Sequence, residues 1–430
     1  MRHVRTAEAV YNPRAFKARE ISMQTLTVLH SHKQIASLIL LTLSVALAIP
    51  AHAQTFSVLW QFNGEDGNGP GTPVLDRGGN VYGSTVGGGP LGSPYGNVYK
   101  LAHAGSGYVL DNLYTFTPHN NNGYYPVGGL TFGPDGALYG TTEGGGSTGY
   151  GVVFRMTPQA TICRAVTCYW DITAIYTFQG GTDVNGPYGN VTFDSAGNMY
   201  GTGGGGQYNQ GAIFKLTHSG GSWTESVIYS FQGSAGSEPN PQLVLDAVGN
   251  IYGTTSAGGA HSWGAVYELS PSGSGWTEQV LYSFTNGSDG RSPSGGVVFD
   301  SAGNLFGSAA NNGQNFGGTV FELSPGSGGW AFNLLYSLSG RMGPEASLTL
   351  DSAGNIYGTT FQDGVNELGS VFELSPSNGG WIYTDLHDFA GGSDGAHPTS
   401  SVALDANGNI FGTSNFAEGF NAGTIFEITR

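Results

Sequence analysis

One string recurs along the chain almost letter for letter and dominates every other feature of the sequence. It reads DSAGNIYGTT at 351–360, DSAGNLFGS at 300–308, DSAGNMYGT at 194–202 and DAVGNIYGTT at 246–255. Its aromatic residue marks seven copies, spaced 51 to 61 residues apart: Tyr82, Tyr139, Tyr200, Tyr252, Phe306, Tyr357 and Phe411. Copies of this length fill residues 55–430, which predicts one array of repeats and leaves no room for a second domain.

Each copy contains four short apolar runs, which we name a, b, c and d. In the fourth copy they are QLVLD (242–246), NIYGT (250–254), GAVYELS (264–270) and WTEQVLYSF (276–284). The 74 glycines argue against helices, because an interior glycine costs a helix about 0.5–1 kcal/mol relative to alanine. Runs rich in Val, Tyr and Phe between glycine-rich turns indicate strands. The sequence therefore predicts an all-β, seven-bladed β-propeller of four-stranded antiparallel blades, each covered on both faces by its neighbours.

The two ends of the repeat array predict that the ring closes. Residues 55–62 (TFSVLWQF) form a d run without its own a, b and c, and residues 423–430 (GTIFEITR) form a c run without a d. We expect 55–62 to pair with 423–429 in the seventh blade, which removes the exposed sheet edges.

The recurring string itself is typical of scaffold. In D-S-A-G-N the aspartate can accept a backbone hydrogen bond two residues on, and the glycine supplies a left-handed residue of the turn. Because a catalytic carboxylate is needed only once, six equivalent aspartates indicate geometry: Asp76, Asp194, Asp246, Asp300, Asp351 and Asp405. The repeated tryptophans that begin d runs indicate blade packing for the same reason: Trp223, Trp276, Trp330 and Trp381.

Residues 1–53 predict a secretory signal peptide. The apolar run 35–49 follows Lys33 and precedes the small residues AHA at 51–53, so cleavage is expected after Ala53. The run has 15 residues, short of the roughly 20 that an uncleaved membrane anchor needs. Met23 would be the more usual start, so we expect translation to begin there and not at Met1. We expect an exported, periplasmic or extracellular protein with no membrane insertion after cleavage.

The net charge and the cysteine content limit which classes of partner and ligand we expect. Removing 1–53 takes away six Lys/Arg and two Asp/Glu, and changes the formal net charge from −16 to −20. Such a field repels nucleic acid. Cys163 and Cys168 are predicted to form a local disulfide in an exported protein, since two thiols without histidine neighbours cannot complete a zinc site. We expect a monomer without cofactor or metal.

The consensus GN-[IL]-Y-G-T-T…G-T-V-F-E-L-S-P…LYSF…DG…P resembles the GloVer tandem repeat of exported bacterial proteins. The resemblance covers essentially all of 55–430, and the first two copies depart most, with NVYKLA (97–102) in place of VFELSP. It implies export and a tandem-repeat scaffold. It implies no activity, because no catalytic residues are assigned to this family.

Functional residues are expected on the face formed by the b–c and d–a loops, where most variable sequence lies. Six b–c loops carry an aromatic residue close to the c run, and Leu368 takes the seventh place: Tyr95, Tyr150, Tyr208, Trp263, Phe316 and Phe420. These rings could stack on sugars or a peptide around the central opening. Alternatively, they wedge between neighbouring blades, since aromatic residues are more often core than site.

Acidic residues supply the rival interpretations. Four carboxylates outside the repeated turns could form a catalytic pair across the funnel: Glu143, Asp363, Glu367 and Glu418. No G-x-S-x-G or H-E-x-x-H motif appears, and His261 and His397 fall in different blades. The Asp-Gly d–a loops contain Asp66, Asp183, Asp289 and Asp394, but one carboxylate per loop favours plain turns over calcium sites.

The sequence thus favours an exported, non-catalytic binding or interaction propeller whose ligand, a glycan or a peptide, occupies the face of the b–c and d–a loops. One alternative is a polysaccharide-active hydrolase or lyase that uses funnel carboxylates. The other is a structural component of the cell envelope.

Overall fold

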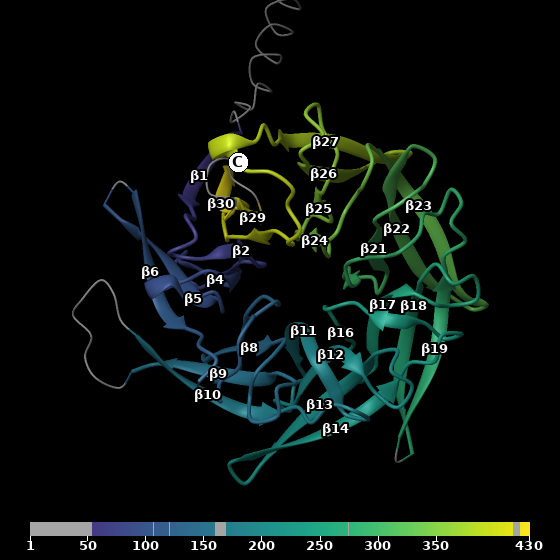
Figure 1. Cartoon of the computed structure of the whole chain (residues 1–430). Helices are drawn as coiled ribbons and strands as arrows, with labels where there is room; N and C mark the ends of the chain where they lie inside the picture. The colour runs from purple at the N-terminus through teal and green to yellow at the C-terminus, as the bar shows by residue number, and fades with distance from the viewer. Residues whose placement is uncertain (1–53, 106, 120, 160–168, 274, 416–421) are drawn as a thin grey trace, which may run out of the picture. The chain divides into compact units, whose positions relative to one another are not determined.

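A computed structural model describes residues 54–430, except residues 106, 120, 160–168, 274 and 416–421. In the unit Gln54–Arg430, seven antiparallel sheets stand around a central axis as the blades of a β-propeller (Figure 1). This confirms the predicted fold class and blade number. Among the described residues, no helix combines the length and hydrophobicity needed to cross a membrane.

The strands follow the chain order within each blade, and the last blade borrows its outer strand from the N-terminal end. Blade 1 comprises β2 (Asn68–Pro70), β3 (Val74–Leu75), β4 (Val81–Gly87), β5 (Asn97–Ala104) and β6 (Gly107–Thr115). Blade 2 comprises β7 (Thr131–Phe132), β8 (Leu138–Thr142), β9 (Val152–Pro158) and β10 (Trp170–Thr177). Blade 3 comprises β11 (Val184–Phe193), β12 (Met199–Gly205), β13 (Ala212–Ser219) and β14 (Ser222–Ser230).

Blades 4 to 7 repeat this order. They comprise β15 (Ser237–Pro239), β16 (Val244–Leu245), β17 (Ile251–Ala257), β18 (Ala265–Ser272) and β19 (Gly275–Ser283); β20 (Val298–Phe299), β21 (Leu305–Ala309), β22 (Phe316–Gly326) and β23 (Gly329–Ser339); β24 (Thr349–Leu350), β25 (Ile356–Thr360), β26 (Ser370–Ser377) and β27 (Gly380–Asp388); β28 (Ala403–Leu404), β29 (Ile410–Ser414), β30 (Thr424–Thr429) and β1 (Thr55–Gln61). Two single-turn 3₁₀ helices lie in loops: η1 (Pro90–Gly92) and η2 (Gly392–Asp394).

Closure of the ring occurs where the sequence predicts it. Strand β1 pairs antiparallel with β30, from Thr55 opposite Thr429 to Gln61 opposite Thr424, with one irregularity between Val58 and Trp60. The first and last strands therefore complete one sheet, and neither is left as a free edge.

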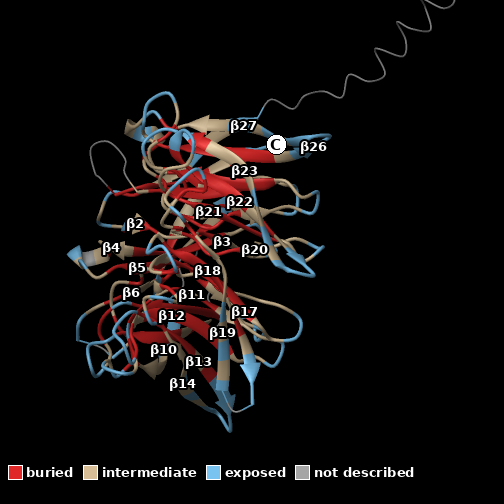
Figure 2. Ribbon diagram, turned by 90° about the vertical axis from the view of Figure 1, so that its right-hand side faces the viewer, coloured by how far each residue is buried: buried red, intermediate tan, exposed pale blue. Residues whose placement is uncertain are grey.

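The core lies between the blades (Figure 2). Each c strand contributes a fully buried ring that sits over the glycine of the Tyr/Phe-Gly step on the adjacent b strand. A Cβ added at these glycines would lie 2.3–2.6 Å from that ring, which explains why glycine recurs: Gly83, Gly140, Gly201, Gly253, Gly307, Gly358 and Gly412. The matching rings are Tyr99, Phe154, Phe214, Tyr267, Phe321, Phe372 and Phe426.

The repeated aspartate turns have the scaffold role that the sequence indicates. In blade 6, Asp351 accepts hydrogen bonds from the backbone amides of Ala353 and Asn355, from the Asn355 side chain and from the Tyr357 hydroxyl. Blade 2 has Gly133 at the position of the aspartate, and Asp135 bonds the Tyr139 hydroxyl instead.

The innermost strands are shorter than the sequence suggests. The prediction gave the a run of the fourth copy five residues (242–246), whereas only Val244–Leu245 pair as β16. In blades 1 and 4 a second piece, β2 or β15, pairs with the same b strand. Between these pieces the chain bulges toward the axis. We call this bulge the inner segment and define it as the three residues after the proline that follows each d–a loop.

Hydrogen bonds between blades explain why the inner segment leaves its own sheet. The first Ser or Thr after the Tyr/Phe-Gly step of each b strand donates its hydroxyl to a backbone carbonyl at the inner edge of the next blade, over 2.6–3.4 Å. The seven donors are Ser84, Thr141, Thr202, Thr254, Ser308, Thr359 and Thr413. Thr413 of the last blade bonds Pro70 of the first, so the series runs around the closed ring.

Candidate functional site

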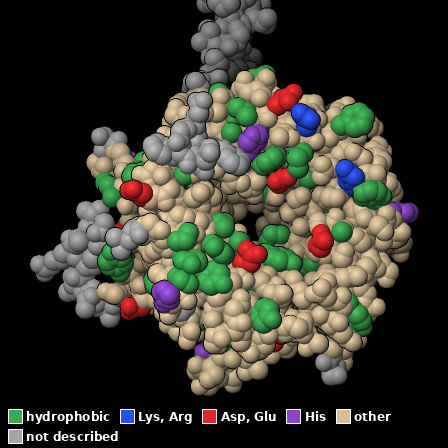
Figure 3. Space-filling view, viewed as in Figure 1, with side chains coloured by type: hydrophobic (Ala, Val, Ile, Leu, Met, Phe, Trp, Pro, Cys, Tyr) green, Lys and Arg blue, Asp and Glu red, His purple; other side chains and the backbone are tan. Residues whose placement is uncertain are grey.

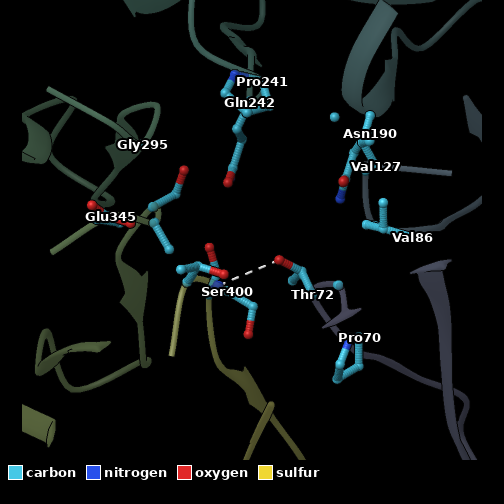
Figure 4. Close-up of a pocket in the computed structure, with 18 of the residues that line it drawn as sticks. Pro70, Thr72, Val86, Val127, Asn190, Pro241, Gln242, Gly295, Glu345 and Ser400 are labelled. Atoms are coloured by element: carbon cyan, nitrogen blue, oxygen red, sulfur yellow. Dashed lines mark hydrogen bonds between the residues drawn. The ribbon is translucent and has the colours of Figure 1, made fainter. Parts of the chain in front are cut away.

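The inner segments of all seven blades surround one cavity of about 370 Å³ on the axis (Figure 4). This volume lies within the range of about 300–1,000 Å³ that small-ligand sites span. Each blade contributes the second residue after its proline: Thr72, Gly128, Gly189, Pro241, Gly295, Ala346 and Ser400. Mostly small residues occupy this position, and they leave the axis open.

The backbone before each proline ties the cavity wall to the preceding blade. The residue before the proline is left-handed in six blades, among them Ser292 with φ 51° and His397 with φ 52°. Its amide donates to the last residue of the preceding b–c loop, as Ser292 does to the Trp263 carbonyl over 2.9 Å. The proline then packs against the glycine that follows this loop: a Cβ on Gly264 would lie 2.6 Å from Cδ of Pro293. The two sets of loops therefore form one rigid face.

Three further polar residues line the cavity wall beside Asn68, Asn415 and several Ser and Thr residues: Asn190, Gln242 and Glu345. Figure 4 shows Gln242 extending from its inner segment into the opening. None of the three side chains makes a hydrogen bond to another described residue, although each is only partly exposed. The wall elsewhere is held by its own contacts, such as the Ser401 amide donating to Thr72 Oγ1 over 3.3 Å (Figure 4).

Glu345 is the only acidic or basic residue that lines the cavity among the described residues. Burial raises the pKa of its carboxyl group, and the nearby His397 works in the opposite direction and lowers it. The His397 ring is itself positioned by Phe361: Nδ1–H donates to the Phe361 carbonyl over 2.8 Å, and the two rings lie 4.7 Å apart.

Two of the predicted aromatic residues pack partly into the blade interfaces. Tyr95 is half-buried, with its ring 5.5 Å from that of Tyr124 and 5.8 Å from that of Tyr125 in the next blade. Trp263 is half-buried against the core between blades 4 and 5, with the Arg291 guanidinium 5.1 Å from its ring centre. Each of these two rings therefore packs between neighbouring blades and also leaves part of its surface exposed.

The other predicted aromatics are more exposed. Tyr150 is 39% exposed and lies against Gly180, Tyr208 is 44% exposed and Phe316 is 71% exposed. Phe420 lies outside the described residues. We conclude that three rings on this face are available to solvent, but none of them lines the cavity.

The six aromatic residues do not occupy one structural position. Only Tyr95, Tyr150 and Trp263 directly precede the left-handed glycine that begins the c strand. The equivalent residues in the remaining blades are Gln210, Gly317, Leu368 and Ala422. The b–c loops differ in length and conformation, so similar distances along the sequence do not give one radius around the axis.

The three candidate catalytic carboxylates that the structure describes do not line the cavity. Glu143 and Glu367 are exposed loop residues, and neither lines the cavity. Asp363 is 7% exposed and accepts a hydrogen bond from Ser339, away from the axis. Glu418 lies outside the described residues.

Sequence reasoning missed Asn190, Gln242 and Glu345. The sequence did contain a signal for Glu345. Glu345 is the one carboxylate among the seven residues that directly follow the repeated proline: Gly71, Val127, Tyr188, Asn240, Ser294, Glu345 and Thr399. A residue that departs in charge from the others at its repeat position identifies a candidate site residue better than a repeated residue does.

The Asp-Gly loops use their carboxylates internally. Asp289 accepts bonds from the amides of Thr285 and Gly287 and from the Tyr282 hydroxyl. Burial raises its pKa, but these bonds outweigh burial and the net shift is downward. Across the described part of the chain, no cluster of three or more His, Cys, Asp or Glu could hold a metal ion. Cys163 and Cys168 lie outside the described residues.

The face around the cavity carries little charge. Figure 3 shows hydrophobic side chains gathered beside the opening, with acidic and basic side chains scattered singly over the face. A ligand on this face would therefore meet rings, amides and hydroxyls more often than ions.

Comparison with known proteins identifies the repeat. The model of the Gloeobacter/Verrucomicrobia repeat matches residues 45–202 and 166–343. The chain belongs to this repeat family. The resemblance inferred from the consensus is confirmed, and in this member of the Gloeobacter/Verrucomicrobia repeat family seven copies build one propeller.

The remaining comparisons add nothing on function. No curated protein matches the sequence of this Gloeobacter/Verrucomicrobia repeat protein. A crystal structure titled as a putative oxidoreductase (glucose dehydrogenase) from Thermus thermophilus is 12% identical, with a TM-score of 0.40. The match covers 88% of this chain and 100% of that one.

Proposed function

We propose that this protein is an exported, non-catalytic carbohydrate-binding propeller whose glycan enters the axial cavity. The observation that carries the proposal is the cavity wall, where the amides of Asn190 and Gln242 have no partner among the described residues. A primary amide offers two donors and an acceptor, which complement the vicinal hydroxyls of a sugar. Neither amide is among the fully buried unpaired groups, so both are accessible to a ligand in the cavity.

Aromatic residues on the cavity face, which we call the rim, support the same ligand class. Tyr95, Tyr124 and Tyr125 form a group of rings at the junction of blades 1 and 2, and Trp263 stands at the junction of blades 4 and 5. Aromatic faces stack on the apolar faces of sugar rings. We assume a scale of about 1–3 kcal/mol per ring by analogy with base stacking. A glycan that reaches from the cavity to the rim would use both kinds of contact.

The geometry favours binding over hydrolysis. Glycoside hydrolases of the usual type need two carboxyl groups about 5–10 Å apart at the scissile bond. Among the described residues, Glu345 is the only carboxylate in the cavity wall, and the four carboxylates singled out from the sequence are not part of that wall where they are described. A purely structural envelope role would leave the amides of Asn190 and Gln242 without a ligand.

Array screening of the purified protein, followed by calorimetric titration, tests the proposal. We expect binding to neutral oligosaccharides, and a loss of about tenfold in affinity for both Asn190→Ala and Gln242→Ala, the value of about one hydrogen bond each. Gln207→Ala is the matched control, because Gln207 is exposed on a b–c loop outside the cavity. Binding of peptides only, or release of shorter sugars from bound oligosaccharides, would replace the proposal.

A further inference from the structure

The electrostatics of the axial cavity are one-sided. Residues from all seven blades line it, yet the described wall contains one carboxylate, Glu345, and no lysine or arginine. The formal charge of residues 54–430 is −20, which adds to the negative potential. Ligands with a carboxylate or sulfate would meet repulsion and find no cation to bind them.

Glu345 also lacks the partners that usually accompany a carboxylate in a protein wall. It makes no hydrogen bond with another described residue. Its electrostatic neighbour is His397, whose Nδ1–H is already donated to the Phe361 carbonyl. A partly buried carboxylate without donors is costly unless a cation or a hydrogen-bond donor reaches it. The group is therefore under-satisfied within the described protein, and Glu345 is one of the residues that line the cavity.

We propose that the cavity selects sugars that carry a free amino group, with the ammonium bound to Glu345 and the neighbouring hydroxyls bound to Asn190 and Gln242. This inference rests on the proposed glycan-binding function and names its ligand class. A protonated amine is compact and presents three donors, and its bonds to a carboxylate are roughly twice as strong as neutral ones.

Related ligands fit less well. An N-acetylated sugar has no positive charge at this position and adds bulk in a cavity of about 370 Å³. A uronic acid brings a second negative charge next to Glu345. Calcium would need six or more oxygen ligands, and the described wall supplies only one carboxylate.

Calorimetric titration with three matched trisaccharides tests the inference: a β-1,4-glucosamine trimer, its fully N-acetylated form and the corresponding glucose trimer. The wild-type protein is expected to bind the glucosamine trimer at least about tenfold more tightly than the other two, the value of one charge-assisted bond. Glu345→Gln should abolish this preference and change the affinity for the glucose trimer by less than about twofold.

Glu367→Gln controls for general attraction between a cationic sugar and an acidic protein, because Glu367 is exposed on the same face but outside the cavity. It should retain the preference at physiological ionic strength, about 150 mM salt, where exposed charges are screened. Thermal unfolding of both variants verifies that they fold.

The outcomes separate this inference from the function on which it rests. Equal affinity for all three trimers, or a preference that survives Glu345→Gln, overturns the amine site and leaves glycan binding intact. A preference lost equally in Glu367→Gln assigns the effect to overall charge and also overturns it. If no trimer binds in any variant, the amine site falls, and the oligosaccharide array alone decides the proposed function.

Discussion

Two carboxylates in blade 6, six residues apart in the chain, lie on opposite faces of the propeller and differ in almost every physical respect. Asp351 lies in the a–b turn and accepts four hydrogen bonds from residues 353–357. Burial raises its pKa, but these bonds outweigh burial, and the net shift is downward. Glu345 lies in the inner segment, makes no such bond, and has its pKa raised by burial.

The contrast distinguishes scaffold from site. The Asp351 carboxylate is saturated by its own turn, and the same arrangement recurs around the ring, so the fold depends on it at many places. The Glu345 carboxylate occurs once and is satisfied by nothing local, so its presence is not explained by folding. In a repeat protein, the residue that departs from its position and lacks partners is the better candidate for function.

Removal of the Asp351 side chain should give the largest effect. Asp351→Ala is expected to lower the free energy of unfolding by about 2–3 kcal/mol, because two backbone amides and two side chains lose a charged acceptor. The measurement is the denaturant midpoint at pH 7, converted through the measured m value.

The pH dependence of this loss has a defined sign. The folded-state pKa of Asp351 is lowered, so its contribution is fully present above the unfolded pKa of about 4 and disappears as pH falls through the folded value. The difference between wild type and Asp351→Ala should therefore shrink in acid. A difference that is small at pH 7, or that grows in acid, would mean that the turn is not a scaffold element.

A pair of aromatic substitutions tests the same distinction within the cavity face. Trp263→Ala should cost about 2 kcal/mol, below the roughly 3–5 kcal/mol of a fully buried ring, because Trp263 is only half-buried in the core between two blades. Tyr150→Ala should cost no more than about 0.5 kcal/mol, since Tyr150 is 39% exposed. Chemical unfolding of the two variants side by side measures the difference. A loss of about 2 kcal/mol or more in both variants would show that both rings are scaffold.

The overall architecture was predictable because local turn chemistry repeats seven times. The D-S-A-G-N string fixes an aspartate turn within five residues, and the incomplete runs at 55–62 and 423–430 require each other. Neither inference needs knowledge of a distant contact. The blade number and the pairing of the terminal strands, such as Thr55 with Thr429, follow directly.

The cavity was not predictable in the same way, because it depends on contacts between blades. The inner segment of blade 4 leaves its sheet when the Asn240 carbonyl accepts the Thr202 hydroxyl of the preceding blade, 38 residues earlier. Nothing in the sequence near Gln242 reports this bond. The aromatic positions were misaligned for a related reason: in six blades the glycine just before the c strand packs against a proline of the next blade, as Gly264 does against Pro293.

Glu345→Gln should produce the smallest change in stability, and its direction is opposite to that of Asp351→Ala. Because the folded-state pKa of Glu345 is raised, the folded protein binds this proton more tightly than the unfolded chain does. Its contribution is complete below the unfolded pKa of about 4.3 and is lost as pH rises through the folded value. Above the folded pKa the ionised carboxylate therefore destabilises the fold, and Glu345→Gln should then increase the free energy of unfolding by less than about 1 kcal/mol, since solvent in the cavity screens the charge. Denaturant unfolding at pH 4 and pH 8 measures this change in stability, with the gain expected only at the higher pH.

A stability loss at pH 8 would show that Glu345 is part of the scaffold, as Asp351 is. A small gain accompanied by loss of ligand is the pattern of a site residue retained at a cost to stability.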